Sequence, residues 1–509
     1  YQLALSDAPD EEILQAFIKA QLPDQFIDDF KTFFEAIRHP IAIRSSSLLE
    51  DSHYQPFAGI YSTYMIPYLD DKDEMLRMLA AAIKSVYASV YFKDSKAYMT
   101  ATRNVIDQEK MAVILQEVVG KQYGDHFYPN FSGVLRSINY YPLGYEKSEE
   151  GIASLALGLG KYIVDGGQTL RVSPYHPTQV LQTSDMEIAL RQTQTQFYAL
   201  DMKRVGVDFK VDDGFNILKL KVKDAENDGA LNFIASTYDA NDRVIRDGLY
   251  DGGRKIISFN GVLRHGVFPL PELLKLSMHH GADSMRRPVE IEFACTLNDD
   301  RTGEFYLLQI RPIVDSKQVL DQDIMAIPDD NCLLRSHNSL GHGVSDDIVD
   351  VVYVKTDENF TASDNPVVAM EVERINKKFL ADGKNYVLVG PGRWGSSDSW
   401  LGVPVKWPHI SAAKLIVETT LKNYSVDPSQ GTHFFQNLTS FGVGYFTIDE
   451  NKGMGFFRKE ILDAMPAVEE TPHVRHVRFS KPLHIMMDGM KQEGLVICDT
   501  EDAKVNDAR

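Results

Sequence analysis

The spacing of apolar residues predicts that helices alternate with short strands in the N-terminal part of the chain. Apolar residues recur every three to four positions in residues 11–37, with a break near Pro23, and again in residues 73–99. Between these helices, HPIAIRSSS (residues 39–47) predicts a strand that enters a polar turn. The run MAVILQEVV (residues 111–119) is apolar and rich in β-branched residues, and we interpret it as a buried strand.

The middle of the chain has mainly strand-like patterns. Residues 131–185 alternate short strand patterns with Gly and Pro turns, and residues 203–254 are polar and strand-like. Between them, EIALRQTQTQFYAL (residues 187–200) has a helical pattern. The apolar runs VEIEFACTL (289–297) and GEFYLLQIRPI (303–313) flank the turn-rich segment NDDRT, and this arrangement predicts a β-hairpin.

A linker and a second folded unit are expected after the hairpin. Residues 317–330 have the polar composition of a linker. Beyond it, the strand patterns VVYVKT (351–356) and NYVLVG (385–390) are mixed with the helical pattern SAAKLIVETTLK (411–422). We therefore expect an α+β protein in which residues 331–509 form a separate mixed α/β domain of unknown role.

Composition narrows the class of protein. A chain of 509 residues is too long for one hydrophobic core, and 44% hydrophobic with 25% charged residues is typical of soluble globular proteins. No uninterrupted apolar run approaches the roughly 20 residues that span a bilayer. The formal charge of −19 argues against nucleic acid or an anionic membrane as the main partner.

The chain start and the cysteines indicate a cytoplasmic protein. The opening YQLALSDAPDEE lacks the pattern of a signal peptide, and since it also lacks an initiator Met, we expect a piece of a longer protein. Cys295, Cys332 and Cys498 are far apart and form no CxxC pair. This spacing argues against a disulfide framework or a zinc site and suits a reducing compartment.

A first candidate for phosphate chemistry follows the strand at residues 39–47. The strand leads Arg44 into a Ser-rich turn, and Glu50 and Asp51 come soon after. A guanidinium group offers a rigid fork of donors that suits phosphate oxygens. The alternative is a strand-end arginine that pairs with Glu50 or Asp51 on the surface.

A second candidate lies in the predicted hairpin. Period-two alternation puts Glu290 and Glu292 on one face of the first strand, and Gln309 and Arg311 on one face of the second. Paired across the hairpin, they would present three oxygen ligands and one cation to a single spot, which suits Mg²⁺ shared with phosphates. The alternative is the exposed polar face of an amphipathic hairpin.

Five short motifs occur in order along the N-terminal part of the chain. They are Ile43 to Ser46 with Glu50-Asp51, Phe57 to Gly59 and Thr63-Tyr64; Met111 to Val119; Ser132 to Val134; Gly158 to Gly160 with Val164 to Gly166; and Glu290 to Phe293 with Leu308 to Pro312. In the same order they resemble the patterns AVRSS…ED…FAG…TY, MAVVVQ-MV, SGV, GLG followed by a V-G turn, and DIEW…LQxRP. These are patterns of the N-terminal nucleotide domain of the phosphoenolpyruvate synthase and pyruvate phosphate dikinase family.

The resemblance implies an ATP-grasp fold for residues 1–316, with lobes of about 1–120 and 121–316 that hold ATP between them. It implies that the catalytic Arg44 and Arg311 contact phosphates, and that Glu292 and Gln309 hold Mg²⁺. Glu290 stands where the family usually has Asp. The remaining nucleotide-binding positions are backbone groups of the strand that borders adenine, at Gln116, Glu117 and Val118.

Departures from the family pattern lie in the same region. The chain starts after the point where family members carry a Gly-Gly-Lys segment whose Lys reaches the phosphates. Lys161 replaces the Glu that usually follows GLG, and SGVLRSINYYP replaces SGV-FTRDP, where only Arg136 is a candidate. The His-carrying domain and the barrel of complete dikinases have no evident counterpart here. His337 and His342 have the wrong spacing for a phosphohistidine loop, so an ordinary surface loop is expected.

The C-terminal part has its own candidates. A strand runs into a Gly-rich loop, where backbone N–H groups could bind an anion. The same stretch holds all three tryptophans of the chain, so a compact aromatic core is the alternative. The loop residues are Arg393, Ser396, Ser397 and Asp398, the tryptophans are Trp394, Trp400 and Trp407, and His433, Gln436 and Asn437 are second-site candidates.

The sequence therefore predicts an ATP-binding phosphotransferase of the kinase type that uses Mg-ATP, with pyruvate or phosphoenolpyruvate as the implied partner. Neither nucleic acid nor a membrane is expected as a partner. One alternative is a non-catalytic ATP-binding regulatory module that acts through its C-terminal domain. Another is phosphorylation of an unrelated acceptor held by the Trp-rich loop.

Overall fold

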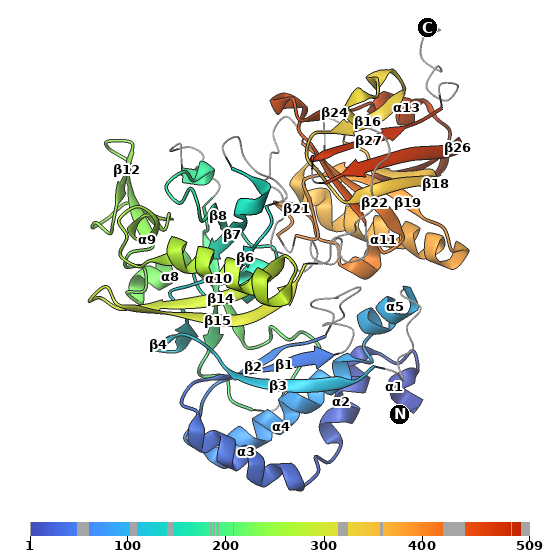
Figure 1. Cartoon of the computed structure of the whole chain (residues 1–509). Helices are drawn as coiled ribbons and strands as arrows, with labels where there is room; N and C mark the ends of the chain where they lie inside the picture. The colour runs from blue at the N-terminus through green and yellow to red at the C-terminus, as the bar shows by residue number, and fades with distance from the viewer. Residues whose placement is uncertain are drawn as a thin grey trace. The chain divides into compact units, whose positions relative to one another are not determined.

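The chain forms two compact units (Figure 1). Each of them combines helices with sheets, which confirms the predicted mixture of α and β structure. Unit 1 consists of Tyr1–Ser137, Glu150–Val164 and Gln168–Pro312, and unit 2 of Ile138–Glu149, Asp165–Gly167 and Ile313–Arg509. The computed structural model describes residues 2–47, 61–101, 109–139, 146–183, 186, 189–190, 193–206, 208–313, 324–356, 360–396, 398–420, 443–489 and 491–499.

Unit 1 begins with helices that cover one face of a three-stranded antiparallel sheet, with strand order β2-β1-β3. Helix α4 starts at Lys72 because the Asp71 carboxylate accepts the backbone N–H groups of Asp73 and Glu74, at 3.0 Å each. The elements are α1 Gln2–Leu5, α2 Asp10–Lys19, α3 Gln25–Ala36, β1 Ile41–Ser47, β2 Tyr64–Ile66, α4 Lys72–Ser89, α5 Lys93–Ala101 and β3 Met111–Glu117.

One stretch of this region passes a simple test for a membrane span. Among the described residues, Lys72–Ala97 is long and apolar enough, with a mean hydropathy of 1.2 in its most apolar window. However, 67% of that window is buried within the protein. Since a core helix gives the same signal, this is weak evidence for a span.

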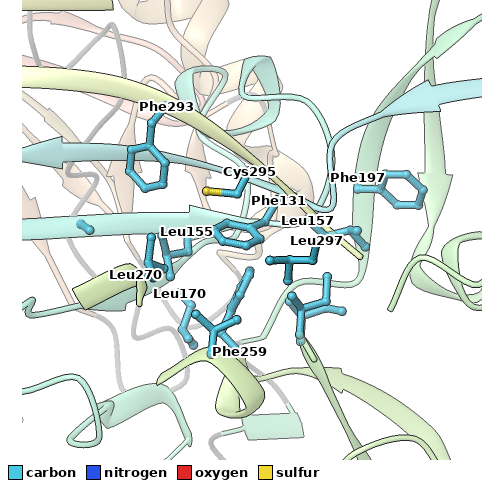
Figure 2. Packing of buried hydrophobic residues seen from close by; sticks show 14 of the residues in the cluster. Phe131, Leu155, Leu157, Leu170, Phe197, Phe259, Leu270, Phe293, Cys295 and Leu297 are labelled. Carbon is cyan, nitrogen blue, oxygen red and sulfur yellow. The ribbon is translucent and has the colours of Figure 1, made fainter. Parts of the chain in front are cut away.

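The main core of unit 1 lies on one face of a five-stranded antiparallel sheet, with strand order β15-β14-β6-β7-β8. Ile291, Phe293 and Cys295 alternate along β14 and are fully buried in this core, together with Leu270 and Leu274 of helix α10. Figure 2 shows part of this cluster. The elements are β6 Phe131–Arg136, β7 Ile152–Ala156, α6 Lys161–Val164, β8 Leu170–Val172, α10 Leu270–Met285, β14 Val289–Leu297 and β15 Gly303–Pro312.

Two smaller antiparallel sheets complete unit 1, with strand orders β10-β9-β5-β4 and β12-β11-β13. Phe197, Ala199 and Leu200 of β9 join the main core. The elements are β4 Lys121–Tyr123, β5 His126–Tyr128, β9 Gln196–Asp201, β10 Ile217–Lys221, α8 Val222–Asn227, β11 Ala235–Asp239, β12 Val244–Asp247, β13 Arg254–Ile257 and α9 Asn260–Leu263.

Unit 2 is built on a mixed sheet, with order β17-β23-β22-β19-β18-β26-β27-β16-β24 and with β25 paired to β26. The four strands β18, β19, β22 and β23 are parallel neighbours, and α11 connects the first two. The elements are β16 Cys332–Ser336, β17 Ser339–Leu340, β18 His342–Val354, α11 Asn365–Asp382, β19 Tyr386–Pro391, β20 Arg393–Trp394, β21 Gly402–Val403, β22 Ala413–Thr419, β23 Gly444–Ile448, β24 Gly455–Phe457, α13 Lys459–Ala464, β25 Ala467–Glu470, β26 Val474–Asp488 and β27 Glu493–Ile497.

Three predictions about single elements were wrong. Residues 413–419 form strand β22 rather than a helix, because Leu415 and Val417 are buried between the parallel neighbours β19 and β23. Residues 196–201 form strand β9 rather than the end of a helix, because they pair with β5 and β10. Strand β3 is not buried: Ala112 and Ile114 are exposed, since helices cover only one face of its sheet.

Candidate functional site

The face of the three-stranded sheet that is turned away from its helices carries the first part of the candidate site. Arg44 lies opposite Ile114 in the register of β1 and β3, and Ala42 lies opposite Gln116. Residues opposite each other in an antiparallel pair have side chains on the same face, so these four share one face. The Arg44 Nη1 atom donates to the Gln116 side-chain oxygen at 3.0 Å, which orients the guanidinium group along this face.

The hairpin of β14 and β15 supplies the second part. Glu290 is paired with Arg311 and Glu292 with Gln309, so the four side chains lie on one face, as the spacing predicted. The register shifts between Glu292 and Phe293, which marks a β-bulge directly beside the group. The opposite face of β14 belongs to the main core.

Side-chain contacts bring the two parts together. The Arg44 Nη2 atom donates to the side-chain oxygen of Gln309 and lies 3.7 Å from a carboxylate oxygen of Glu292. Nearby, the Gln116 amide nitrogen approaches the Leu308 carbonyl oxygen at 3.5 Å. Four residues that the sequence predicted therefore form one cluster: Arg44, Gln116, Glu292 and Gln309.

Arg311 is the second cation of this cluster. Its Nη2 atom donates to the Glu292 carboxylate at 2.6 Å and approaches the Gln309 side-chain oxygen at 3.4 Å. Gln309 thus accepts from both guanidinium groups. Arg44 and Arg311 converge on the same pair of oxygen-bearing side chains.

Glu290 is buried, although the sequence predicted that it faces the ligand together with Glu292. It is 4% exposed, and its Oε2 atom accepts from Arg136 Nε at 2.7 Å and is 2.6 Å from Arg136 Nη2. Its other oxygen is 3.7 Å from Arg311 Nε. The sequence indicated Arg136 as the candidate of the stretch after SGV but assigned it no partner; in the structure it is paired with Glu290 in the register of β6 and β14.

The cluster is positively charged although the chain is acidic. Among its members in the described part of the chain, Arg44, Arg136 and Arg311 contribute three positive charges and Glu290 and Glu292 two negative charges, which leaves one positive charge in excess. The whole chain has a formal charge of −19. Such a local excess of arginine is suited to an anionic ligand that brings its own counter-charge.

Two other predicted residues have different surroundings. The Glu117 carboxylate accepts the backbone N–H groups of Arg38 at 2.8 Å and His39 at 3.2 Å. The Val118 N–H group donates to the Pro40 carbonyl oxygen at 2.8 Å. Their roles in nucleotide binding remain predictions.

Lys161, which follows the GLG motif, contacts a carboxylate that also binds the TY motif. Lys161, which begins α6, forms an ion pair with Asp213 at 3.2 Å, and Asp213 also accepts the Thr63 N–H group at 2.9 Å. These contacts link the GLG and TY motifs through one carboxylate. Glu50, Asp51 and the stretch Phe57 to Gly59 lie outside the described residues.

The Gly-rich loop and two of the tryptophans in unit 2 are engaged within the protein. In the Gly-rich loop, the N–H groups of residues 392 to 395 donate to Thr419 O, Leu401 O, the Glu418 carboxylate and Val403 O, so they are engaged within the protein and the anion hypothesis is not supported. Trp394 and Trp407 are buried, as the alternative of an aromatic core predicted, whereas Trp400 is 70% exposed.

The remaining candidates of unit 2 are only partly described. The His337 Nδ1 atom lies 2.9 Å from one carboxylate oxygen of Glu493, and this imidazole is 42% exposed. The side chain of His342, Ser397, and the second-site residues His433, Gln436 and Asn437 lie outside the described residues.

Glu418 is a buried carboxyl group that the sequence did not reveal. It is the second-last residue of β22, and it accepts hydrogen bonds from the Tyr445 hydroxyl and from the Trp394 N–H group, the latter at 3.2 Å. Burial raises the pKa of Glu418 to about 7, and the hydrogen bond from Tyr445 and the charge of Arg393 oppose this shift. The group anchors the Gly-rich loop to the sheet.

The chain is similar to a protein described as a phosphotransferase and matches one protein family. A stretch of 157 residues is 28% identical to a Bacillus subtilis (strain 168) protein described as "Uncharacterized phosphotransferase YvkC". This stretch covers 31% of the chain and only 17% of that relative. The family described as "Pyruvate phosphate dikinase, AMP/ATP-binding domain" matches residues 4–330, which include every residue of the cluster. Because that match covers more than half of the chain, the protein belongs to the pyruvate phosphate dikinase AMP/ATP-binding domain family.

Proposed function

We propose that the cluster formed by Arg44, Glu292, Gln309 and Arg311 binds Mg-ATP and that the chain is a phosphotransferase. The observation that carries the proposal is the convergence of Arg44 and Arg311 on Gln309, beside Glu292. The family match supports ATP as the nucleotide. The proposal includes the ATP-grasp arrangement of residues 1–316, with lobes of about 1–120 and 121–316, and a separate domain at 331–509.

The two guanidinium groups would bind the phosphates. Arg44 now donates to Gln309, and Arg311 donates to Glu292. The side chains of Arg44, Glu292 and Arg311 are 22%, 19% and 10% exposed. Phosphate oxygens accept guanidinium hydrogen bonds in the same geometry as carboxylates do. ATP could therefore replace protein oxygens as the acceptor without moving the strands.

The oxygens released by that exchange fit Mg²⁺. A carboxylate and an amide oxygen, from Glu292 and Gln309, are hard ligands that face each other across the hairpin. Among the described residues, no group of three or more His, Cys, Asp or Glu side chains could hold a metal alone. When bound, Mg²⁺ would be shared with the phosphates and would neutralise part of their charge.

Strand β3 would border the adenine. It is an edge strand of its sheet within the described residues, and Ile114 beside Arg44 is 47% exposed. Backbone groups alternate in direction along an antiparallel strand, and the Val118 N–H group points to Pro40. The N–H and C=O groups of Glu117 therefore point to the opposite edge, where an adenine could accept and donate.

Pyruvate is the phosphoryl acceptor that we propose, with phosphoenolpyruvate as the product, in a cytoplasmic protein. The test is titration calorimetry of the purified chain with ATP, with and without Mg²⁺, followed by ³¹P NMR with pyruvate present. We expect Mg²⁺-dependent ATP binding and release of AMP and phosphate. Tight binding without turnover would indicate a regulatory module instead, and absence of ATP binding would overturn the proposal.

A further inference from the structure

Five charged side chains form a row in which positive and negative groups alternate. The order is Arg136, Glu290, Arg311, Glu292 and Arg44, from strands β6, β14, β15, β14 and β1. The closest nitrogen–oxygen distances between successive members are 2.6, 3.7, 2.6 and 3.7 Å. The row thus alternates tight and loose pairs.

Exposure increases steadily along this row. The side chains of Arg136 and Glu290 are 4% and 5% exposed, that of Arg311 is 10% exposed, and those of Glu292 and Arg44 are 19% and 22% exposed. A ligand can therefore reach the outer members but not the inner pair. Through Glu290 and Arg311, Arg136 can act on a ligand without contacting it.

The two oxygens of Glu290 have different partners. Arg136 approaches Oε2 with two nitrogens, at 2.7 and 2.6 Å, whereas Oε1 is 3.7 Å from Arg311 Nε. Arg311 instead donates from Nη2 to Glu292, toward the exposed end of the row. Arg136 thus holds the buried carboxylate at hydrogen-bond distance, and Arg311 is held by it only at ion-pair distance.

We infer that Arg136 is a positioning residue that keeps the Arg311 guanidinium directed at the phosphates. This inference rests on the proposed function. A buried carboxylate that loses one cation is strongly destabilised, so without Arg136 it would draw Arg311 inward. Arg136 lies in the stretch SGVLRS, where the chain departs from the family pattern.

The test measures the dissociation constants of ATP and adenosine for four variants: Arg136→Met, Arg136→Lys, Glu290→Gln and the double variant Arg136→Met/Glu290→Gln. We expect Arg136→Met to bind ATP about tenfold more weakly, because a charged hydrogen bond to phosphate is lost. Adenosine binding should stay unchanged. The double variant should recover ATP binding to within about threefold, since no buried carboxylate then competes for Arg311.

Arg136→Lys keeps the cation but lacks the fork of donors, so it should fold and lose about threefold in ATP affinity. If Arg136→Met does not fold, this variant and its combination with Glu290→Gln carry the test. Wild-type ATP affinity in a folded Arg136 variant, or a double variant as weak as the single one, would overturn the inference.

Arg311→Met separates this inference from the proposed function. If Arg311→Met binds ATP as the wild type does, the proposed phosphate site is wrong. If Arg311→Met weakens binding and the Arg136 variants do not, only the positioning role is wrong. Circular dichroism of each variant establishes that affinities are compared between folded proteins.

Discussion

The Arg44 Nη2 atom donates a hydrogen bond to the side-chain oxygen of Gln309, although the two residues are 265 positions apart in the chain. Arg44 comes from a three-stranded sheet and Gln309 from the edge strand of a five-stranded sheet. The contact joins strands β1 and β15, whose motifs are separate in the sequence.

Replacing Arg44 by methionine should weaken ATP binding about tenfold or more. The substitution keeps an unbranched apolar stem but removes the donors, and a hydrogen bond to a charged group is worth roughly 1.5–3 kcal/mol. Titration calorimetry measures the change. Arg77→Met is the matched control, because Arg77 is 65% exposed and pairs only with a neighbour on its own helix among the contacts described. Equal losses in both variants would count against a phosphate role for Arg44.

Replacing Glu292 by glutamine should change the response of ATP binding to Mg²⁺. With excess Mg²⁺ we expect affinity to fall about tenfold, because one anionic ligand of the metal is lost. In EDTA we expect equal or tighter binding, since the carboxylate no longer repels the phosphates. Glu304→Gln, at an exposed position on the neighbouring strand β15, is the control. The same loss with and without Mg²⁺ would contradict a metal role for Glu292.

The stability of unit 2 should depend on pH through Glu418. Its folded pKa of about 7 is above the ordinary value of 4.5, so the folded state binds more protons between these values. The contribution is fully present below about pH 4.5 and is lost as pH rises through 7, on the order of 3 kcal/mol in all. We expect the Glu418→Gln variant to lack this slope.

Urea unfolding at several pH values, followed by tryptophan fluorescence, measures this effect, because all three tryptophans of the chain lie in unit 2. Glu460→Gln is the control, since Glu460 is exposed on α13. If wild type and Glu418→Gln had the same pH dependence from 5 to 8, the assignment to Glu418 would be wrong.

Replacing Gly133 by alanine should destabilise unit 1. An added Cβ would lie 2.1 Å from the ring of Phe293, which is fully buried in the main core. Overpacking of this kind costs about 1–3 kcal/mol or more. At Gly160, in the GLG motif, an added Cβ would lie 3.5 Å from Ser132, so Gly160→Ala should cost little. Thermal unfolding followed by circular dichroism compares the two, and equal melting temperatures would refute the packing argument.

The sequence pattern predicted an element correctly where the contacts that form the element lie close together in the sequence. The hairpin of β14 and β15 was predicted because its alternation, turn and partner strand all lie within 24 residues of sequence. Strand β22 was mistaken for a helix because SAAKLIVETTLK has apolar residues at helical spacing, whereas its pairing with β19 and β23 is not encoded locally. Burial between parallel neighbours decided that segment.

By itself, the sequence determined the family motifs, the shared face of Glu290, Glu292, Gln309 and Arg311, and a strand that carries Arg44, because strand alternation fixes the side of each residue. Only the tertiary structure decided that Arg44 meets Gln309 and that Arg136 holds Glu290. These contacts join strands far apart in the chain, and their geometry depends on the packing of whole sheets. A buried charge must be paired, and the fold determines which oppositely charged side chain lies close enough to pair with it.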